Sequence, residues 1–591
     1  MEVSITRTFD LLKNLEVNHP DKTDILSRSV GGNWTKVSTK EYIRHSHLVA
    51  YAFLSLGYQK GDKVITICNN RPEWNFVDMG LNLAGMVHIP VYPTLSEEEY
   101  IHIFNHSDAK VIILGNKQLY KKIAPFVEKM ESPAKIYMMD DHEEVESLSY
   151  LYKLGEENEA KYQDIVEKIK EETSPDEMAT MIYTSGTTGT PKGVMLSHRN
   201  LMFNALAHAK KQPVTCHQKM VSFLPLCHIY ERSMNYEYQS IGISIYYAES
   251  ISTIQRDLAD CHADGFCSVP RVLEMMYFKF EAAGKNLTGL KKKIYSKAWA
   301  FANNFDFYNN GRLYLLKRDI YDKLVYNKWR EALGGHEMII VSGDSSIQGK
   351  IVRLFNAAKL RIFEGYGMTE TSPVIAVNNP VEGINVIGTV GTPLEGTELK
   401  IAEDGEILTK GPHIMLGYYK DPAQTKEIID EDGFLHTGDI GKLIDGKYLQ
   451  ITDRKKEIFK LSLGKYVAPQ AIETKLKESS YIENCIVIGE NQKFASAIII
   501  PDMSRLHFWA AKHKVTYKDN EELAKNPKII AKIHKEVEIV NETLAPHEKI
   551  KRERVILAEW TPNNGLLSPT LKLKRAKIHA KYSDIIKEIY K

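Results

Sequence analysis

The sequence predicts an α/β protein with a large N-terminal domain of helix-covered, mostly parallel sheets, a small β-rich subdomain and a small α+β C-terminal domain. Two observations predict this organisation. Short apolar runs that suit buried strands alternate with helical patterns, as in parallel sheets covered by helices. Beyond residue 395 the pattern changes to short strands and Gly/Asp turns, and mixed helix and strand return at about residue 453.

The expected strands of the large domain are short apolar runs at residues 63–68, 110–115, 178–183, 337–343 and 359–365. Between them, residues 201–211 and 347–358 carry apolar side chains at helical spacing. Two charged segments, about residues 155–177 and 275–335, look irregular, although the second has helical periodicity.

The β-rich subdomain is expected around two segments, residues 396–411 and 445–469, in which Gly and Asp separate short strands and predict hairpins. We place the domain boundary where mixed structure returns. This gives an N-terminal domain of residues 1–452 and a C-terminal domain of residues 453–591.

The composition is that of an ordinary globular protein: 43% of the 591 residues are hydrophobic, 26% are charged, and the formal net charge is +1. Nucleic-acid proteins usually have a strong basic bias, so we expect no nucleic-acid partner. The six cysteines form no Cys-x-x-Cys pair, which predicts reduced thiols and no zinc site. Neither a signal-peptide pattern nor an apolar run of about 18 residues is found. We therefore expect a cytoplasmic protein, with contact to a membrane surface and a homodimer left open.

Residues 183–193, YTSGTTGTPKG, follow an apolar strand and precede a helical pattern. Glycines let the backbone turn tightly and present N–H groups, hydroxyls add donors and Lys192 adds charge, so the segment predicts a polyphosphate-binding loop. It is not a Walker A loop, because Pro191 replaces a glycine and Gly193 replaces the Ser or Thr after the lysine. The expected nucleotide-binding residues are Thr184, Ser185, Gly186, Thr187, Thr188, Gly189 and Lys192.

This loop resembles the signature of the adenylate-forming superfamily, which contains acyl-CoA synthetases, luciferases and peptide-synthetase adenylation domains. The family's other motifs follow in order from about residue 180 to the end. Residues 269–280 and 322–335, and the C-terminal SPTLKLKR, are similar to the long-chain fatty acyl-CoA synthetase branch. The resemblance implies a ligase that uses Mg²⁺ and ATP to convert a long-chain fatty acid to acyl-AMP, releases pyrophosphate, and transfers the acyl group to CoA.

Residues 224–232, LPLCHIYER, resemble the next motif of the family. The resemblance implies that His228 lies beside the acyl carboxylate and the adenylate and is a catalytic residue. Apolar residues between positions 223 and 245 are candidates for the acyl pocket, and they would serve equally well as core.

Residues 363–371, FEGYGMTET, resemble a third motif of the family, and the expected nucleotide-binding residues are Glu364, Gly365, Tyr366, Gly367 and Thr369. The ring of Tyr366 offers a face for adenine, and Thr369 can donate to the α-phosphate. Glu370 is a hard oxygen ligand for magnesium, with Thr184 as the second expected ligand. Thr369 and Glu370 are the candidate catalytic residues of this motif.

Two segments are expected to hold the nucleoside. Residues 342–346, SGDSS, stand where the family usually has Ser-Gly-Gly-Ala-Pro, so Gly343 is kept as a nucleotide-binding residue and Asp344 departs from the pattern. In residues 432–441, DGFLHTGDIG, Asp439 is expected to accept hydrogen bonds from both ribose hydroxyls, with Arg454 in support.

The C-terminal domain is expected to be mobile, because Asp453 matches the hinge residue about which the family's C-terminal domain turns between two catalytic poses. Residues 462–469, SLGKYVAP, resemble the hairpin that packs against pantetheine. Gly464 and Lys465 are therefore the expected CoA-binding residues.

Near the C-terminus, residues 567–575, LSPTLKLKR, match the segment in which the family carries one catalytic lysine. That lysine contacts the acyl carboxylate and the α-phosphate during adenylation, where a positive charge offsets charge developing on oxygen. Alignment from the Pro-Thr pair favours Lys574, and Lys572 remains the alternative.

Other functions stay open at this point. The acceptor could be a carrier-protein thiol or an amine, or the product could remain acyl-AMP. A degenerate acyl- or nucleotide-binding regulator is the alternative outside enzymes. The presence of Lys192, Glu370, Asp439 and Lys574 argues against a degenerate site.

Overall fold

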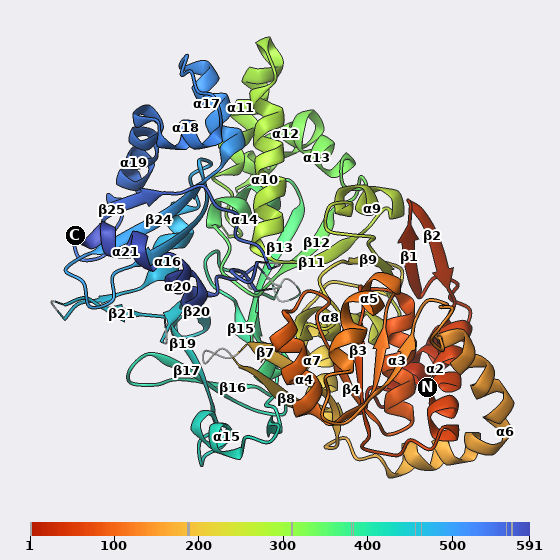
Figure 1. Ribbon diagram of the computed structural model, residues 1–591. Coiled ribbons are helices and arrows are strands. Elements are labelled where there is room, and N and C mark those ends of the chain that lie inside the picture. The colour runs from red at the N-terminus through yellow and green to blue at the C-terminus, as the bar shows by residue number, and fades with distance from the viewer. Residues whose placement is uncertain are drawn as a thin grey trace. The chain divides into compact units, whose positions relative to one another are not determined.

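A computed structural model describes residues 3–185, 190–308, 311–379, 381, 383, 385–455, 457–462, 464–562, 564–568 and 571–591. The chain forms two compact units (Figure 1). The first contains Met1–Leu399, Thr409–His436 and Asp445–Leu449. The second contains Lys400–Leu408, Thr437–Ile444 and Gln450–Lys591.

Two sheets form the centre of the first unit. One has the order β15 (Thr392–Pro393), β14 (Val374–Val377), β13 (Leu360–Gly367), β12 (Met338–Ser342), β11 (Gly265–Ser268), β9 (Lys219–Ser222), β10 (Ser244–Tyr247), β1 (Leu26–Val30), β2 (Asn33–Val37). The other has the order β18 (Gly417–Tyr418), β8 (Pro191–Ser197), β7 (Met178–Ser185), β4 (Val87–Pro90), β3 (Lys63–Ile67), β5 (Ala109–Leu114), β6 (Lys135–Met138). Their inner strands are parallel, as the sequence predicts, and antiparallel pairs lie at the edges.

Helices follow the strands of this unit along the chain, as expected for parallel sheets. They are α1 (Asp10–Asn18), α2 (Thr39–Ser55), α3 (Pro72–Leu83), α4 (Glu97–Ser107), α5 (Lys117–Val127), α6 (Leu148–Glu172), α7 (His198–Ala209), α8 (Ile229–Ile241), α9 (Ile254–Cys261), α10 (Pro270–Lys285), α11 (Gly289–Ala302), α12 (Arg312–Tyr321), α13 (Asn327–Glu331), α14 (Gly349–Ala357) and α15 (Pro422–Ile428). A π turn, η1 (Asp322–Tyr326), and a 3-10 turn, η2 (Thr369–Thr371), complete the unit.

Each expected strand and helix of the large domain is confirmed, and the described residues of the segment 275–335 include most of α10 together with α11, α12, η1 and α13. The expectation of irregular structure over residues 155–177 is wrong for most of the segment, because α6 continues to Glu172. The glycine at position 155 does not interrupt this helix. A Cβ atom there would lie 2.3 Å from the carbonyl oxygen of Leu48, so the glycine lets α6 approach α2 closely.

A smaller sheet has the order β16 (Glu398–Ile401), β17 (Glu406–Lys410), β19 (Leu435–Ile444), β20 (Tyr448–Arg454), and both units contain residues of its strands. The expected hairpin of residues 396–411 is confirmed, because β16 and β17 are neighbours in this sheet, and β20 pairs with β19, which lies before the second expected segment. A second expected hairpin is formed by β21 (Phe459–Lys460) and β22 (Tyr466–Val467), which pair antiparallel.

The second unit is α+β, as predicted. Its sheet has the order β23 (Ile482–Ile488), β24 (Ala495–Pro501), β25 (Ile550–Val555). Its helices are α16 (Pro469–Leu476), α17 (Met503–Lys512), α18 (Asn520–Lys525), α19 (Pro527–Asn541), α20 (Arg575–Lys581) and α21 (Ser583–Tyr590). Fully buried side chains such as Ile499, Ile533 and Val537 form the core of this unit. All six cysteines of the chain are free thiols.

Candidate active site

The phosphate loop connects the antiparallel strands β7 and β8. Thr184 pairs with Lys192 across the two strands, and Ser185 pairs with Pro191. Gly186, Thr187, Thr188 and Gly189 lie outside the described residues. The strands therefore bring the Thr184 and Lys192 backbones together at the base of the loop, where a Thr hydroxyl and a Lys ammonium can both serve a polyphosphate.

Tyr418 links two of the candidate site residues. Its hydroxyl donates to Oε1 of Glu370 over 2.8 Å, and its ring lies under Nζ of Lys192, 5.2 Å from the ring centroid. Burial, and then the charge of Glu370, raise the pKa of the Tyr418 phenol, so it remains a hydrogen-bond donor. A cation, an aromatic ring and a carboxylate thus form one row on β8, β18 and η2.

Glu370 and Thr369 occupy the turn η2 and are only 7% and 8% exposed. The turn is fixed by Thr371, whose side-chain oxygen accepts from the backbone N–H of Met368 over 3.0 Å. The backbone N–H of Met415 donates to the carbonyl of Glu370 over 3.0 Å. These bonds hold the carboxylate in a buried position, where a cation stabilises it most.

Strand β13 carries the remaining residues of the same motif. Gly367 is required by packing, since a Cβ atom there would lie 1.8 Å from the carbonyl oxygen of Pro373. Tyr366 is partly exposed, which leaves ring surface available for stacking. Glu364 pairs with Ser342 of β12, and burial raises the pKa of its carboxyl to about 8. Gly365 pairs with Val377 on the other side of the strand.

His228 is the N-cap residue of α8, and its Nδ1 accepts from the backbone N–H of Tyr230 over 3.2 Å. Its Nε2 lies 3.9 Å from Oδ1 of Asp344. Gly343 lies beside the same helix, because a Cβ atom there would be 3.2 Å from the Tyr230 ring. The segment that departs from the family pattern therefore places a carboxylate next to the candidate catalytic histidine.

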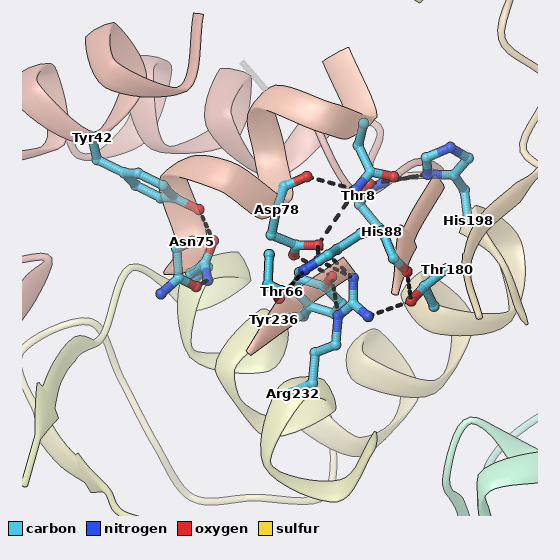
Figure 2. A network of polar contacts seen from close by, with 12 residues as sticks. Thr8, Tyr42, Thr66, Asn75, Asp78, His88, Thr180, His198, Arg232 and Tyr236 are labelled. Carbon is cyan, nitrogen blue, oxygen red and sulfur yellow. Dashed lines mark hydrogen bonds and ion pairs between the residues drawn. The ribbon is translucent and has the colours of Figure 1, made fainter. Parts of the chain in front are cut away.

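A buried polar network connects α8 to the sheet that bears the phosphate loop (Figure 2). The guanidinium of Arg232 on α8 donates to Oδ1 of Asp78 and, over 2.6 Å, to the hydroxyl of Thr180 on β7. Tyr236 donates to Oδ2 of Asp78 over 2.6 Å, and His88 on β4 contacts Oδ1 over 2.7 Å. Burial alone would raise the pKa of the Asp78 carboxyl. Arg232 and His88 outweigh this effect and together lower the pKa to about 2. The network fixes α8 against β7 and β4.

The second unit contains the other candidate residues. Oδ1 of Asp439 on β19 lies 3.1 Å from Nε of Arg454 on β20 in an ion pair, so the two expected ribose-binding residues lie together. The neighbouring Asp453 is 6% exposed, and burial raises the pKa of its carboxyl to about 6. Asp453 also accepts from the backbone N–H of Arg454 over 2.7 Å.

The expected CoA-binding residues lie in the turn between β21 and β22. Gly464 has a φ of 84°, a left-handed conformation that glycine adopts freely. The backbone N–H of Gly464 donates to the carbonyl of Leu461, and that of Leu461 donates to the carbonyl of Lys465, each over 2.8 Å. These bonds close the hairpin.

Lys574 is the N-cap residue of α20, and its backbone N–H donates to the carbonyl of Leu566 over 2.9 Å. Leu573, between the two candidate lysines, forms a β-bridge with Leu567. Arg575 follows at once and forms ion pairs with Glu473 and Glu457. The segment with both candidate lysines is thus anchored within the second unit.

Sequence reasoning missed two groups at this site, Tyr418 and the Asp78–Arg232 network. Tyr418 lies 48 residues from Glu370, and Asp78 lies 154 residues from Arg232, so no local spacing reveals either contact. Arg232 lies in a motif that the sequence singles out, which was the one available signal. Within the described parts of the chain, no three His, Cys, Asp or Glu side chains gather as a metal-binding group.

Comparison with protein families gives two matches that follow one another along the chain. The profile described as AMP-binding enzyme matches residues 14–419. The profile described as AMP-binding enzyme C-terminal domain matches residues 456–591.

Curated relatives match over most of their length. The chain is 33% identical to Long chain acyl-CoA synthetase 6, peroxisomal, of Arabidopsis thaliana, over 90% of this chain and 78% of that protein. It is 30% identical to Long-chain-fatty-acid--CoA ligase 1 of Homo sapiens, over 94% of this chain and 82% of that protein.

Solved structures share the fold at low sequence identity. The adenylation domain of a carboxylate reductase from Mycobacterium chelonae has a TM-score of 0.75 at 20% identity, with 99% of this chain and 91% of that chain covered. o-Succinylbenzoate CoA synthetase from Bacillus subtilis, in complex with its acyl-adenylate, has a TM-score of 0.66 at 19% identity, with 97% and 98% covered.

Proposed function

Because the chain belongs to the AMP-binding enzyme family, we propose that it is a long-chain fatty acid–CoA ligase that forms AMP. The relatives named as long-chain acyl-CoA synthetases and ligases support the choice of acid and of acceptor. ATP and CoA are then co-substrates.

The proposed reaction has two halves. In the first, a carboxylate oxygen of the fatty acid attacks the α-phosphorus of ATP, the new C–O–P linkage forms, and the bond to pyrophosphate breaks. In the second, the sulfur of CoA attacks the acyl carbon, the bond to AMP breaks, and the thiol gives up its proton. AMP is a far better leaving group than the oxide of a free carboxylate, which is why activation precedes transfer.

The Lys192–Tyr418–Glu370 row is the observation that carries this proposal. A cation, a hydroxyl donor and a buried carboxylate meet beside the strands that frame the phosphate loop. Lys192 would neutralise phosphate oxygens, and Thr369 would donate to the α-phosphate. In reactions at phosphorus, catalysis comes mainly from groups that are positioned in advance to stabilise the charge of the transition state.

The residues fit a magnesium ion. Mg²⁺ usually keeps waters and binds one or two carboxylates together with substrate phosphates, so a protein cage of three side chains is not needed. Glu370 offers a buried carboxylate whose Oε1 is oriented by Tyr418, and Thr184 would be the second ligand. The ion would neutralise phosphate charge when bound.

The other candidate residues have these proposed roles. Adenine would contact Gly343, Glu364, Gly365, Tyr366 and Gly367, and the loop residues Ser185, Gly186, Thr187, Thr188 and Gly189 would bind phosphates.

Asp439 would bind the ribose with Arg454, and His228 would orient the acyl carboxylate. Lys574 would serve adenylation, Gly464 and Lys465 would bind CoA, and residues 453–591 would move as a domain about Asp453.

The test is AMP and pyrophosphate release with ATP, Mg²⁺ and a panel of fatty acids, measured with and without CoA. The proposal expects ATP–pyrophosphate exchange that depends on a long-chain acid, and acyl-CoA only when CoA is added. Hydrolysis of ATP to ADP and phosphate, whichever acid is supplied, would contradict it.

A further inference from the structure

Helix α12 packs on the first unit by one face only. The rings of Tyr314 and Tyr321 lie against Phe301 of α11, with ring centroids 4.4 Å and 5.2 Å apart. None of the residues of α12, all of which the structure describes, is buried. The helix is thus attached by aromatic contacts on its inner side, and its outer side faces solvent.

The outer face of α12 and η1 exposes four large apolar side chains. Leu313, Leu316, Ile320 and Leu324 are 77%, 63%, 57% and 48% exposed. Their spacing of three and four residues puts them on one stripe, because a helix has about 3.6 residues per turn. A single exposed leucine needs no explanation, but an aligned set forms a patch that costs free energy in water.

The same region is strongly basic. Residues 285–330 contain 11 Lys and Arg against three Asp and no Glu, a local net charge of +8 in a chain of net charge +1. On the helix, Lys317 follows Leu316 on one side of the stripe, and Lys323 precedes Leu324 on the other. Both lysines are exposed. An apolar stripe between lysines, in a region of positive charge, is typical of helices that lie on anionic membranes.

We propose that the outer face of α12 and η1 docks on the surface of an anionic lipid bilayer. The four apolar side chains would enter the boundary between headgroups and acyl chains, about 5–10 Å deep. The stems of Lys317 and Lys323 would lie along the apolar surface while their ammonium groups meet anionic headgroups. No described helix has the length and hydropathy needed to cross the bilayer, so the contact is with the surface.

The attachment of α12 favours a flat partner over a protein that encloses a helix. A partner that encloses α12 on several sides would also have to contact its inner side. The side of α12 with Tyr314 and Tyr321 is occupied by Phe301, which leaves the outer stripe available. A bilayer surface needs that stripe alone.

The experiment is sedimentation of the full-length protein with vesicles, without ATP or CoA, so that the result does not depend on ligase activity. Vesicles of phosphatidylcholine alone are compared with vesicles that also contain phosphatidylglycerol. The protein is expected to sediment with the anionic vesicles only, and added salt is expected to release it.

Two variants test the face itself. Leu316→Gln with Ile320→Gln removes the centre of the stripe and is expected to weaken binding more than tenfold. Lys317→Gln with Lys323→Gln is expected to weaken it by roughly fivefold per lysine. Helix α19 supplies the matched control, Ile530→Gln with Ile539→Gln, because these side chains are 43% and 51% exposed without forming a stripe with basic edges.

Each variant is first shown to unfold at the same temperature as the parent protein. Loss of binding in both α12 variants, with the α19 control unchanged, supports the proposal. Equal binding to neutral vesicles, no binding to any vesicle, or α12 variants that bind like the parent would overturn it. Binding to soluble polyglutamate in place of anionic vesicles would assign the face to an acidic protein and also overturn it.

Discussion

Nε2 of His228 lies 3.9 Å from Oδ1 of Asp344, a residue that stands where the family pattern has a small one. Asp344 follows β12 with a φ of 72°, in the left-handed region that favours glycine. A strained, buried carboxylate beside a candidate catalytic histidine indicates a functional contact.

The first prediction concerns this pair. Asp344→Asn keeps the shape and removes the carboxylate charge that faces His228, so acyl-AMP formation is expected to slow roughly fivefold, which corresponds to about 1 kcal/mol in the activation free energy. Conversion of supplied acyl-AMP to the thioester is expected to stay unchanged. Single-turnover measurement of each half-reaction checks this.

Asp344→Gly separates the contact from backbone strain. Glycine relieves the left-handed conformation, so this variant is expected to be more stable by about 1 kcal/mol and still slow in adenylation. If both variants adenylate at the parental rate, the His228–Asp344 contact has no catalytic role.

The second prediction concerns the hydroxyl of Tyr418. Tyr418→Phe leaves Glu370 without its 2.8 Å donor and is expected to lower ATP–pyrophosphate exchange about tenfold or more, because a bond to a charged group contributes about 1.5–3 kcal/mol. Titration with Mg²⁺ measures whether the variant needs a higher Mg²⁺ concentration for half-maximal exchange. Tyr419→Phe is the matched control, since that neighbouring hydroxyl donates to Asp108 at the surface. Parental exchange and an unchanged Mg²⁺ titration in Tyr418→Phe would argue against the assigned site.

The third prediction distinguishes the two C-terminal lysines. Lys574→Ala is expected to abolish acyl-AMP formation and to leave the transfer from supplied acyl-AMP to CoA intact, because the charge is needed only while pyrophosphate leaves. Lys572→Ala is the control and is expected to retain both half-reactions. The reverse pattern would assign the role to Lys572.

The fourth prediction concerns the buried ion pair of Figure 2. Arg232→Met leaves the Asp78 carboxylate buried without its cation and is expected to cost about 3–5 kcal/mol in the free energy of unfolding. Adding Asp78→Asn removes the stranded charge, so the double variant is expected to recover part of the loss. Urea unfolding measures both.

The exposed pair Arg199–Asp176 supplies the control for that measurement. Its side chains are 47% and 63% exposed, so Arg199→Met is expected to cost less than about 1 kcal/mol. Equal losses in Arg232→Met and in the double variant would show that packing, and not charge, fixes α8.

The fifth prediction concerns pH. Glu231 on α8 is 1% exposed, and burial raises the pKa of its carboxyl from 4.5 to about 8. The folded protein therefore holds a proton that the unfolded chain has released, so this contribution to stability is full below pH 4.5 and is lost as the pH rises towards about 8. Glu231→Gln is expected to match the parent near acidic pH and to unfold several degrees higher at alkaline pH. Thermal unfolding measured between acidic and alkaline pH checks the direction of this change, with Glu521→Gln at an exposed position as the control.

The sequence could predict those parts of the fold that depend on residues close together along the chain. Apolar runs located β3, β5 and β7 of one large sheet and β12 and β13 of the other. The charged segment 155–177 was predicted wrongly, because a sequence does not reveal that α6 packs closely against α2 at Gly155. The contact between Tyr418 and Glu370 was beyond prediction, since it depends on the pairing of β18 with β8.

The ion pairs of Arg575 have a consequence for the rate of the proposed reaction. Its guanidinium is held by Glu473 at 2.6 Å and by Glu457 at 2.7 Å, so the backbone directly after Lys574 cannot slide or swing by itself. In the proposed reaction, delivery of the Lys574 ammonium group would then depend on motion of the whole folded unit, whose friction with the solvent far exceeds that of one side chain. Higher solvent viscosity would therefore slow turnover by slowing this motion.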